Sequence, residues 1–156
     1  MTIITREDAC DIVDHALGYV ARFYEVPASL ADALGVARRY ASGQAARWEL
    51  DAARASAYAY LGRKTRLAVR YLAEAVASAA DSGSHHDAEW STRAARVCAE
   101  AATWAVGYAC VCGPSEWPYG LRAENAHLCG AWSEASWQQR TYGHTCAAEI
   151  AAEVVG

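Results

Sequence analysis

The sequence predicts an all-α protein: a single-domain bundle of about five to seven helices, mostly antiparallel, that takes in the whole chain, 1–156. Alanine accounts for 37 of the 156 residues, and only three prolines interrupt the chain. Alanine is the best helix former, and proline is the worst. Apolar residues also recur three and four positions apart through most of the chain, which is the spacing of one helix face. Short connections between the predicted helices favour antiparallel neighbours.

The first two helices have recognisable ends. Thr5, followed three positions later by Asp8, resembles a capping box with aspartate in place of glutamate. This helix should end just before Pro27, because the residue before a proline avoids the α region. Ser29 is the expected N-cap of the second helix, and Gly43 is its expected C-terminal stop.

Residues 44–61 and 65–80 predict the third and fourth helices. We expect the third to pack against the core through one apolar face, which comprises Ala45, Trp48, Ala52, Ala55, Tyr58 and Ala59. The fourth carries an apolar set made of Leu67, Val69, Leu72, Val76 and Ala79. Arg63, Arg66 and Arg70 follow at helical spacing, on what should be its exposed side.

Residues 86–112 predict the central helix of the bundle. An unbroken stripe runs along it through Trp90, Ala94, Val97, Cys98, Ala101, Trp104, Ala105, Tyr108, Val111 and Cys112. Asp87 is a plausible N-cap, and Gly113-Pro114 stops the helix. An irregular aromatic loop at 113–120 follows, and residues 121–155 predict one or two further helices around Gly143.

Composition narrows the range of functions. The chain has six tryptophans and nine tyrosines among its alanines, so we expect a core of large rings set among very small side chains, with Trp48, Trp90 and Trp104 inside. The net charge of −4 does not indicate a nucleic-acid partner. No signal peptide and no stretch of ~18 apolar residues is recognisable, so we expect a cytoplasmic protein with reduced cysteines and no membrane partner.

Six cysteine and histidine residues fall close together near the C-terminus. If the chain binds a metal such as zinc, its ligands are Cys110, Cys112, His127, Cys129, His144 and Cys146. The spacing argues against such a site, because residues two positions apart on a helix point about 200° apart. We therefore favour buried cysteines in the core and expect no cofactor.

No catalytic motif is present in the sequence. It has neither a P-loop nor a G-x-G-x-x-G loop, and no E-x-x-H pair of the di-iron bundle type. The sequence therefore predicts a protein that is not an enzyme.

Two sets of residues are candidates for binding a partner protein. The first is a basic cluster formed by Arg47, Arg54, Arg63, Arg66 and Arg70, although such residues are also typical of a solvated helix face that attracts acidic helices elsewhere in the chain. The second is a set of rings, Trp117, Tyr119 and Trp137, which would suit an interface; the loop carrying Trp117 and Tyr119 could equally pack as a lid over the bundle end.

Residues 28–60 resemble a known group of proteins, the alanine-rich helical immunity proteins of actinobacteria, myxobacteria and their phages. The matching positions are Pro27, Leu30, Ala33, Leu34, Val36, Ala37, Tyr40, Ala41, Gly43, Ala45, Glu49, Leu50, Ala52, Ala53, Arg54, Ala57, Tyr58 and Ala59. The resemblance implies a small helical inhibitor that occludes a toxin, a nuclease or a host defence effector, as an immunity protein or a phage counter-defence factor. A homodimer is compatible with this function, and a helical small-molecule or zinc-binding protein is the alternative.

Overall fold

A computed structural model describes residues 5–63, 66–81, 87–109 and 126–142, with the side chains of 87–96, 126–130, 132 and 142 left out. The predicted all-α bundle of five to seven helices is confirmed. The described residues form six helices: α1 (Arg6–Val20), α2 (Ala28–Ala41), α3 (Arg47–Tyr58), α4 (Leu67–Ala79), α5 (Asp87–Ala109) and α6 (Ala126–Tyr142). Of the helices described, none is long and apolar enough to cross a membrane.

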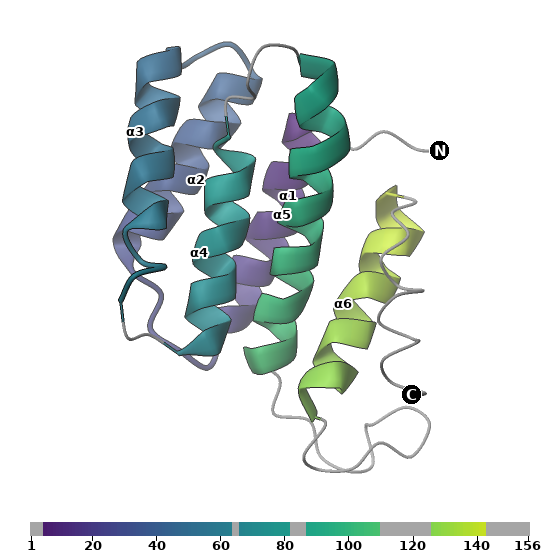
Figure 1. The fold of residues 1–156 in the computed structure, drawn as a ribbon. Helices are drawn as coiled ribbons and strands as arrows, with labels where there is room; N and C mark the ends of the chain where they lie inside the picture. The colour runs from purple at the N-terminus through teal and green to yellow at the C-terminus, as the bar shows by residue number, and fades with distance from the viewer. Residues whose placement is uncertain (1–4, 64–65, 82–86, 110–125, 143–156) are drawn as a thin grey trace.

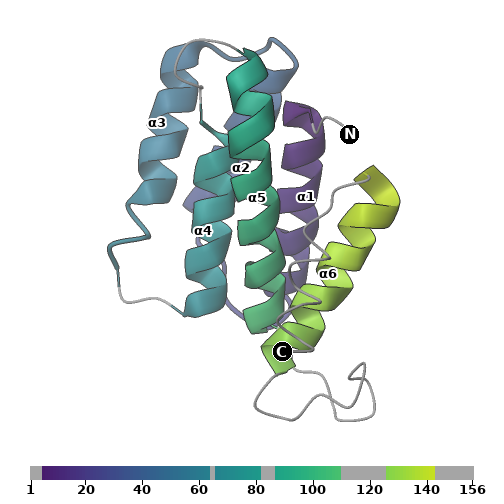
Figure 2. The same ribbon diagram turned by 45° about the vertical axis from the view of Figure 1, so that its right-hand side comes forward.

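Successive helices run up and down, and α6 lies outside the others (Figure 1). The helix predicted to be central, α5, packs against α1, α4 and α6, whereas α4 packs against α1, α2, α3 and α5. Helix α3 is at the opposite edge of the bundle, where it contacts α2 and α4. In Figure 2, α6 is tilted relative to the other helices and is separated from α3 and α4 by α5. One long side of α3 is therefore left without a neighbouring described helix.

The predicted start of α1 and the predicted end of α2 are both confirmed. The Thr5 hydroxyl accepts a hydrogen bond from the Asp8 amide at 3.1 Å, and the Asp8 carboxylate accepts one from the Thr5 amide at 3.0 Å. Gly43 follows α2 with a φ of 76°, a left-handed conformation that glycine adopts without a steric penalty. The next amide, that of Gln44, then donates to the Arg39 carbonyl at 2.7 Å, which completes a Schellman motif.

The predicted cap of α2 at Ser29 is wrong. Helix α2 begins at Ala28, and Pro27 stands at the N-cap with a φ of −57°. Ser29 is therefore inside the first turn, where its hydroxyl donates to the Tyr60 hydroxyl at 3.0 Å. This bond joins the start of α2 to the connection between α3 and α4.

The core is made of alanine and branched aliphatic residues, and the prediction that large rings fill it is wrong for the described side chains. Every described tryptophan, tyrosine and phenylalanine side chain is at least partly exposed. The largest fully buried apolar side chains are Ile12, Leu30, Leu50, Leu72, Val13, Val20 and Val76. Alanines fill much of the remaining core along α4 and α5, so the helices approach closely and leave no room for a ring between them.

Two leucines on α4 allow this description of the core to be tested. Leu72 is fully buried, whereas Leu67 is 48% exposed on the same helix. We expect Leu72→Ala to lower the free energy of unfolding by about 2–5 kcal/mol, because it leaves a cavity that the surrounding alanines cannot fill. Leu67→Ala should change it by less than about 1 kcal/mol. Urea denaturation followed by circular dichroism measures both, and equal losses would contradict the assignment of Leu72 to the core.

Candidate protein-binding surface

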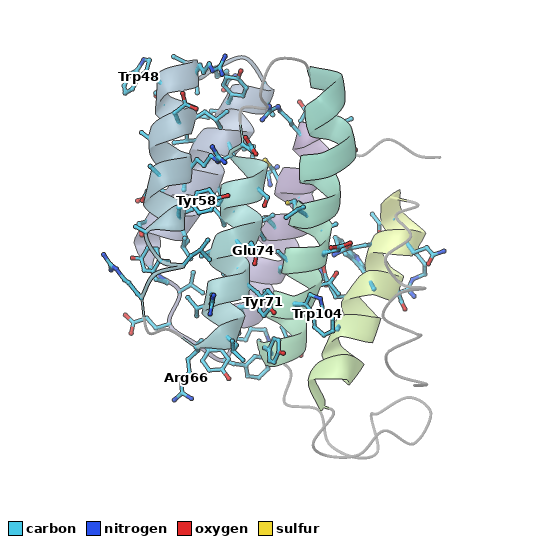
Figure 3. The ribbon with its side chains drawn as sticks, viewed as in Figure 1. Trp48, Tyr58, Arg66, Tyr71, Glu74 and Trp104 are labelled. Carbon is cyan, nitrogen blue, oxygen red and sulfur yellow. The ribbon has the colours of Figure 1, made fainter. Side chains whose placement is uncertain are left out.

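Helix α3 has two apolar stripes on opposite sides, and only one of them faces the bundle. Leu50, Ala53 and Ala57 are buried. The stripe predicted to pack inward points outward instead, so that Trp48 is 73% exposed and Tyr58 is 46% exposed. We define the outer face of α3 as the five exposed residues Trp48, Ala52, Ala55, Tyr58 and Ala59. Figure 3 shows Trp48 projecting from the first turn of α3, away from the other helices.

The orientation of α3 has a simple physical cause. Leu50 is the only branched aliphatic residue of the helix, and burying it against α2 and α4 decides which side faces inward. Trp48 is two positions away from Leu50, and two positions correspond to about 200° around a helix. Burial of Leu50 therefore places Trp48 in solvent, and the prediction that Trp48 belongs to the core is wrong.

The structure does not gather the five predicted arginines into one patch. Arg47 is exposed beside Trp48 in the first turn of α3. Arg54 turns toward the C-terminal end of α4, where its guanidinium lies 3.8 Å from the Asp81 carboxylate and 5.1 Å from the centre of the Tyr58 ring.

The other three predicted arginines lie at the opposite end of α3 from Arg47. Arg63, Arg66 and Arg70 are all exposed. Only Arg70 is on α4, because that helix begins at Leu67; Arg63 belongs to the connection before it and Arg66 is its N-cap. Arg66 and Arg70 keep the expected spacing of one helical turn, with the Arg70 amide donating to the Arg66 carbonyl at 3.0 Å, whereas Arg63 lies outside the helix.

The three rings predicted to contact a partner, Trp117, Tyr119 and Trp137, are only partly covered by the structure. Trp117 and Tyr119 lie outside the described residues. Trp137, on α6, is partly buried against the core, and its ring stacks on the His15 ring with the centroids 3.8 Å apart. The Trp137 ring therefore packs against other residues of this protein and is not fully exposed for a partner. Trp104, expected in the core, is partly exposed on α5 beside Tyr108.

A buried polar cluster joins α6 to α1 and α5, and no pattern in the sequence had indicated it. The Glu134 carboxylate is 1% exposed and lies 2.9 Å from Nδ1 of His15, which is 42% exposed. The Gln138 amide donates to Glu134 at 3.3 Å, to the Thr103 hydroxyl at 3.1 Å and to the Ala99 carbonyl at 3.3 Å. In the sequence, the one indication of this burial is that Glu134 and Gln138 fall at helical spacing with the apolar Ala131 and Ala135.

The electrostatics of this cluster suit a structural role. Burial raises the pKa of Glu134 above its ordinary value, while the charge on His15 and the hydrogen bonds from Gln138 and His15 lower it. Among the contacts of the described residues, the partners of the Glu134 carboxylate are His15 and Gln138. We regard the cluster as the polar contact that fixes α6 on the bundle.

The described residues contain only part of the predicted cysteine and histidine set. Cys110, Cys112, His144 and Cys146 lie outside them, and His127 and Cys129 are on α6 without described side chains. In the described part of the chain, no three His, Cys, Asp or Glu side chains are grouped as metal ligands.

The two cysteines with described side chains are buried. Both Cys10 and Cys98 carry free thiols. Burial raises the pKa of Cys10 to about 11 and also raises that of Cys98, so both are protonated at neutral pH. These two behave as the small core residues that we expected.

Comparison with known proteins identifies no relatives. No family model matches the chain, and no match is found among curated proteins or solved structures.

The charge on Glu134 should make the stability of the protein depend on pH. The raised pKa means that a protonated Glu134 stabilises the folded state fully below the unfolded value of 4.5, and this stabilisation is lost as the pH rises through the folded value. Glu134→Gln keeps a hydrogen-bonding side chain but has no charge. We expect its free energy of unfolding, relative to wild type, to increase as the pH rises above 4.5 and to level off once the pH exceeds the folded pKa of Glu134.

Urea denaturation at a series of pH values measures this difference between variant and wild type. His15 faces Glu134 from α1 and lowers the pKa of Glu134, so the series is repeated in a His15→Gln background, where the total change with pH should be larger. A constant difference across the pH range would contradict an energetic cost of ionising Glu134.

Proposed function

We propose that this protein is a non-enzymatic inhibitor that binds another protein through the outer face of α3 and occludes it. The observation that carries the proposal is the 73% exposure of Trp48 on a helix whose opposite side is buried. Large exposed apolar side chains that gather on one rigid element are typical of interaction sites.

The geometry of the outer face suits a helix-packing partner. Ala52, Ala55 and Ala59 follow Trp48 at intervals of four, three and four residues, so they form a shallow strip along the helix axis. Small residues let a partner backbone approach closely, and the rings of Trp48 and Tyr58 flank the strip as anchors. Tryptophan, tyrosine and arginine are the residues that most often dominate binding energy at interfaces.

The class of inhibitor follows from the sequence resemblance. A protein similar to the immunity proteins would neutralise a toxin, a nuclease or a host defence effector, as an immunity protein or a phage counter-defence factor. Most residues that carry the resemblance lie on α2 and α3, and α3 is the helix that presents the outer face. No observation on the described residues favours the alternative of a small-molecule or zinc-binding protein.

Truncation of Trp48 should weaken partner binding without affecting the fold. We expect Trp48→Ala to reduce affinity for the partner at least roughly tenfold, because anchor residues cost about 2 kcal/mol or more when truncated. Ala55→Glu, in the middle of the outer face, should have a similar effect. The thermal unfolding temperature should stay close to that of wild type, since Trp48 makes little contact with the core.

The experiment uses the tagged full-length chain as bait, with quantitative mass spectrometry of captured proteins. Ala31→Glu is the matched control, because Ala31 is also an exposed helical alanine but is on α2. The supporting result is one protein that is captured by wild type and by Ala31→Glu but not by Trp48→Ala or Ala55→Glu. The same protein should crosslink to p-benzoylphenylalanine placed at position 55 but not at position 31. Once purified, this protein should lose its activity on addition of one equivalent of the wild-type chain.

Two results would overturn the proposal. One is a crosslinked product that contains only two copies of this chain, which would make the outer face a homodimer contact. The other is a set of captured proteins that is the same for all three variants and wild type.

A further inference from the structure

One end of the bundle carries exposed arginines from two separate connections. The connection 21–27 after α1 and residues 59–63 and 66 before α4 lie at this end (Figure 1). Ser29, in the first turn of α2, donates a hydrogen bond to Tyr60 and so links the start of α2 to the second of these segments. We define the basic end as four exposed arginines and two exposed apolar residues, which are Arg22, Arg63, Arg66, Arg70, Phe23 and Leu67. The connection after α1 also has the exposed Glu25. Figure 3 shows Arg66 pointing away from the helices here.

The charges of the basic end are not neutralised within the described part of the chain. Other arginines pair with carboxylates: Arg38 with Asp11 at 2.6 Å, Arg39 with Glu49 at 3.7 Å and Arg54 with Asp81 at 3.8 Å. Among the described residues, the four arginines of the basic end form no ion pair. Glu25 is the only acidic residue in either connection, against three arginines and a lysine.

Two of these arginines are held in place by aromatic rings. The Arg63 guanidinium lies 4.9 Å from the centre of the Tyr60 ring. The Arg22 guanidinium lies 5.6 Å from the centre of the Tyr19 ring and 5.6 Å from that of Phe23. Stacking limits the freedom of the guanidinium groups but leaves their edges open to an anion, so less entropy is lost when a ligand binds.

Carboxylate is the anion that this arrangement fits best. A guanidinium edge pairs with a carboxylate through two parallel hydrogen bonds. A nucleic acid is disfavoured because its phosphates would leave the apolar outer face of α3, which leads toward this end, without a counterpart. A membrane surface is disfavoured because Phe23 and Leu67 are only 38% and 48% exposed, which is little apolar area for anchoring.

We propose that the basic end binds a carboxylate-rich segment of the same partner that packs on the outer face of α3. This inference rests on the proposed function, because it concerns the partner of that surface. The outer face leads toward the basic end, since Ala59 at the C-terminus of α3 is followed by the connection that carries Arg63 and Arg66. The partner would thus place apolar side chains along α3 and acidic ones at its end.

The test uses the full-length protein and a fluorescein-labelled peptide of glutamate, alanine and leucine, with leucine at positions i, i+3, i+4 and i+7. Fluorescence anisotropy measures its affinity for wild type, for Arg63→Glu/Arg66→Glu and for Arg140→Glu. Arg140 is the matched control because it is also exposed, but lies on α6. We expect the double variant to bind the peptide roughly tenfold more weakly and the control to bind it as wild type does.

Three comparison probes separate the alternatives: the same peptide with lysine in place of glutamate, a single-stranded DNA of similar length, and vesicles containing phosphatidylserine. The lysine peptide should not bind. The inference is overturned if DNA or vesicles bind in an Arg63- and Arg66-dependent manner while the acidic peptide does not. It is also overturned if Arg63→Glu/Arg66→Glu binds the acidic peptide with the same affinity as Arg140→Glu. In that case, loss of peptide binding in Trp48→Ala would still support the proposed function.

Discussion

The close packing of α4 and α5 through alanine is the constraint on which the rest of the structure depends. Ala73, Ala75 and Ala77 of α4 are buried on more than one side of that helix, and Ala102 and Ala105 of α5 are buried too, so both helices meet their neighbours through very small side chains. Helices that approach closely gain many van der Waals contacts but leave little volume for larger groups. The rings must then lie at the edges of the bundle, where Tyr71 stacks on Tyr108 and where Trp48 reaches solvent.

The sequence was informative where a local rule decides the structure. Thr5 with Asp8, and Gly43 after α2, are signals that act within four residues, and both were predicted correctly. The face of α3 could not be predicted in the same way, because Trp48 with its alanines and Leu50 with its alanines both repeat at helical spacing. Periodicity identifies the helix, but only tertiary packing decides which of two apolar stripes is buried.

The buried cluster on α6 shows a second limit of prediction from sequence. Glutamate and glutamine are usually found on exposed helix faces, so their types alone gave no reason to place Glu134 and Gln138 inside. They are buried because His15 and Thr103, which are far away in the sequence, provide their hydrogen-bond partners. The predicted basic cluster is likewise affected by a residue that is distant in the sequence, since Arg54 pairs with Asp81 instead of lying beside Arg63, Arg66 and Arg70.

The interface between α6 and the other described helices is partly polar, which affects how the protein unfolds locally. Helices α1 to α5 share one continuous apolar core, whereas α6 contacts α5 and touches α1 only lightly, through an interface that includes Glu134 and Gln138. Hydrogen bonds exchange readily with water, so a polar interface separates at a lower free energy than a core of the same size. We therefore expect α6 to be the first of the described helices to detach when the native state fluctuates.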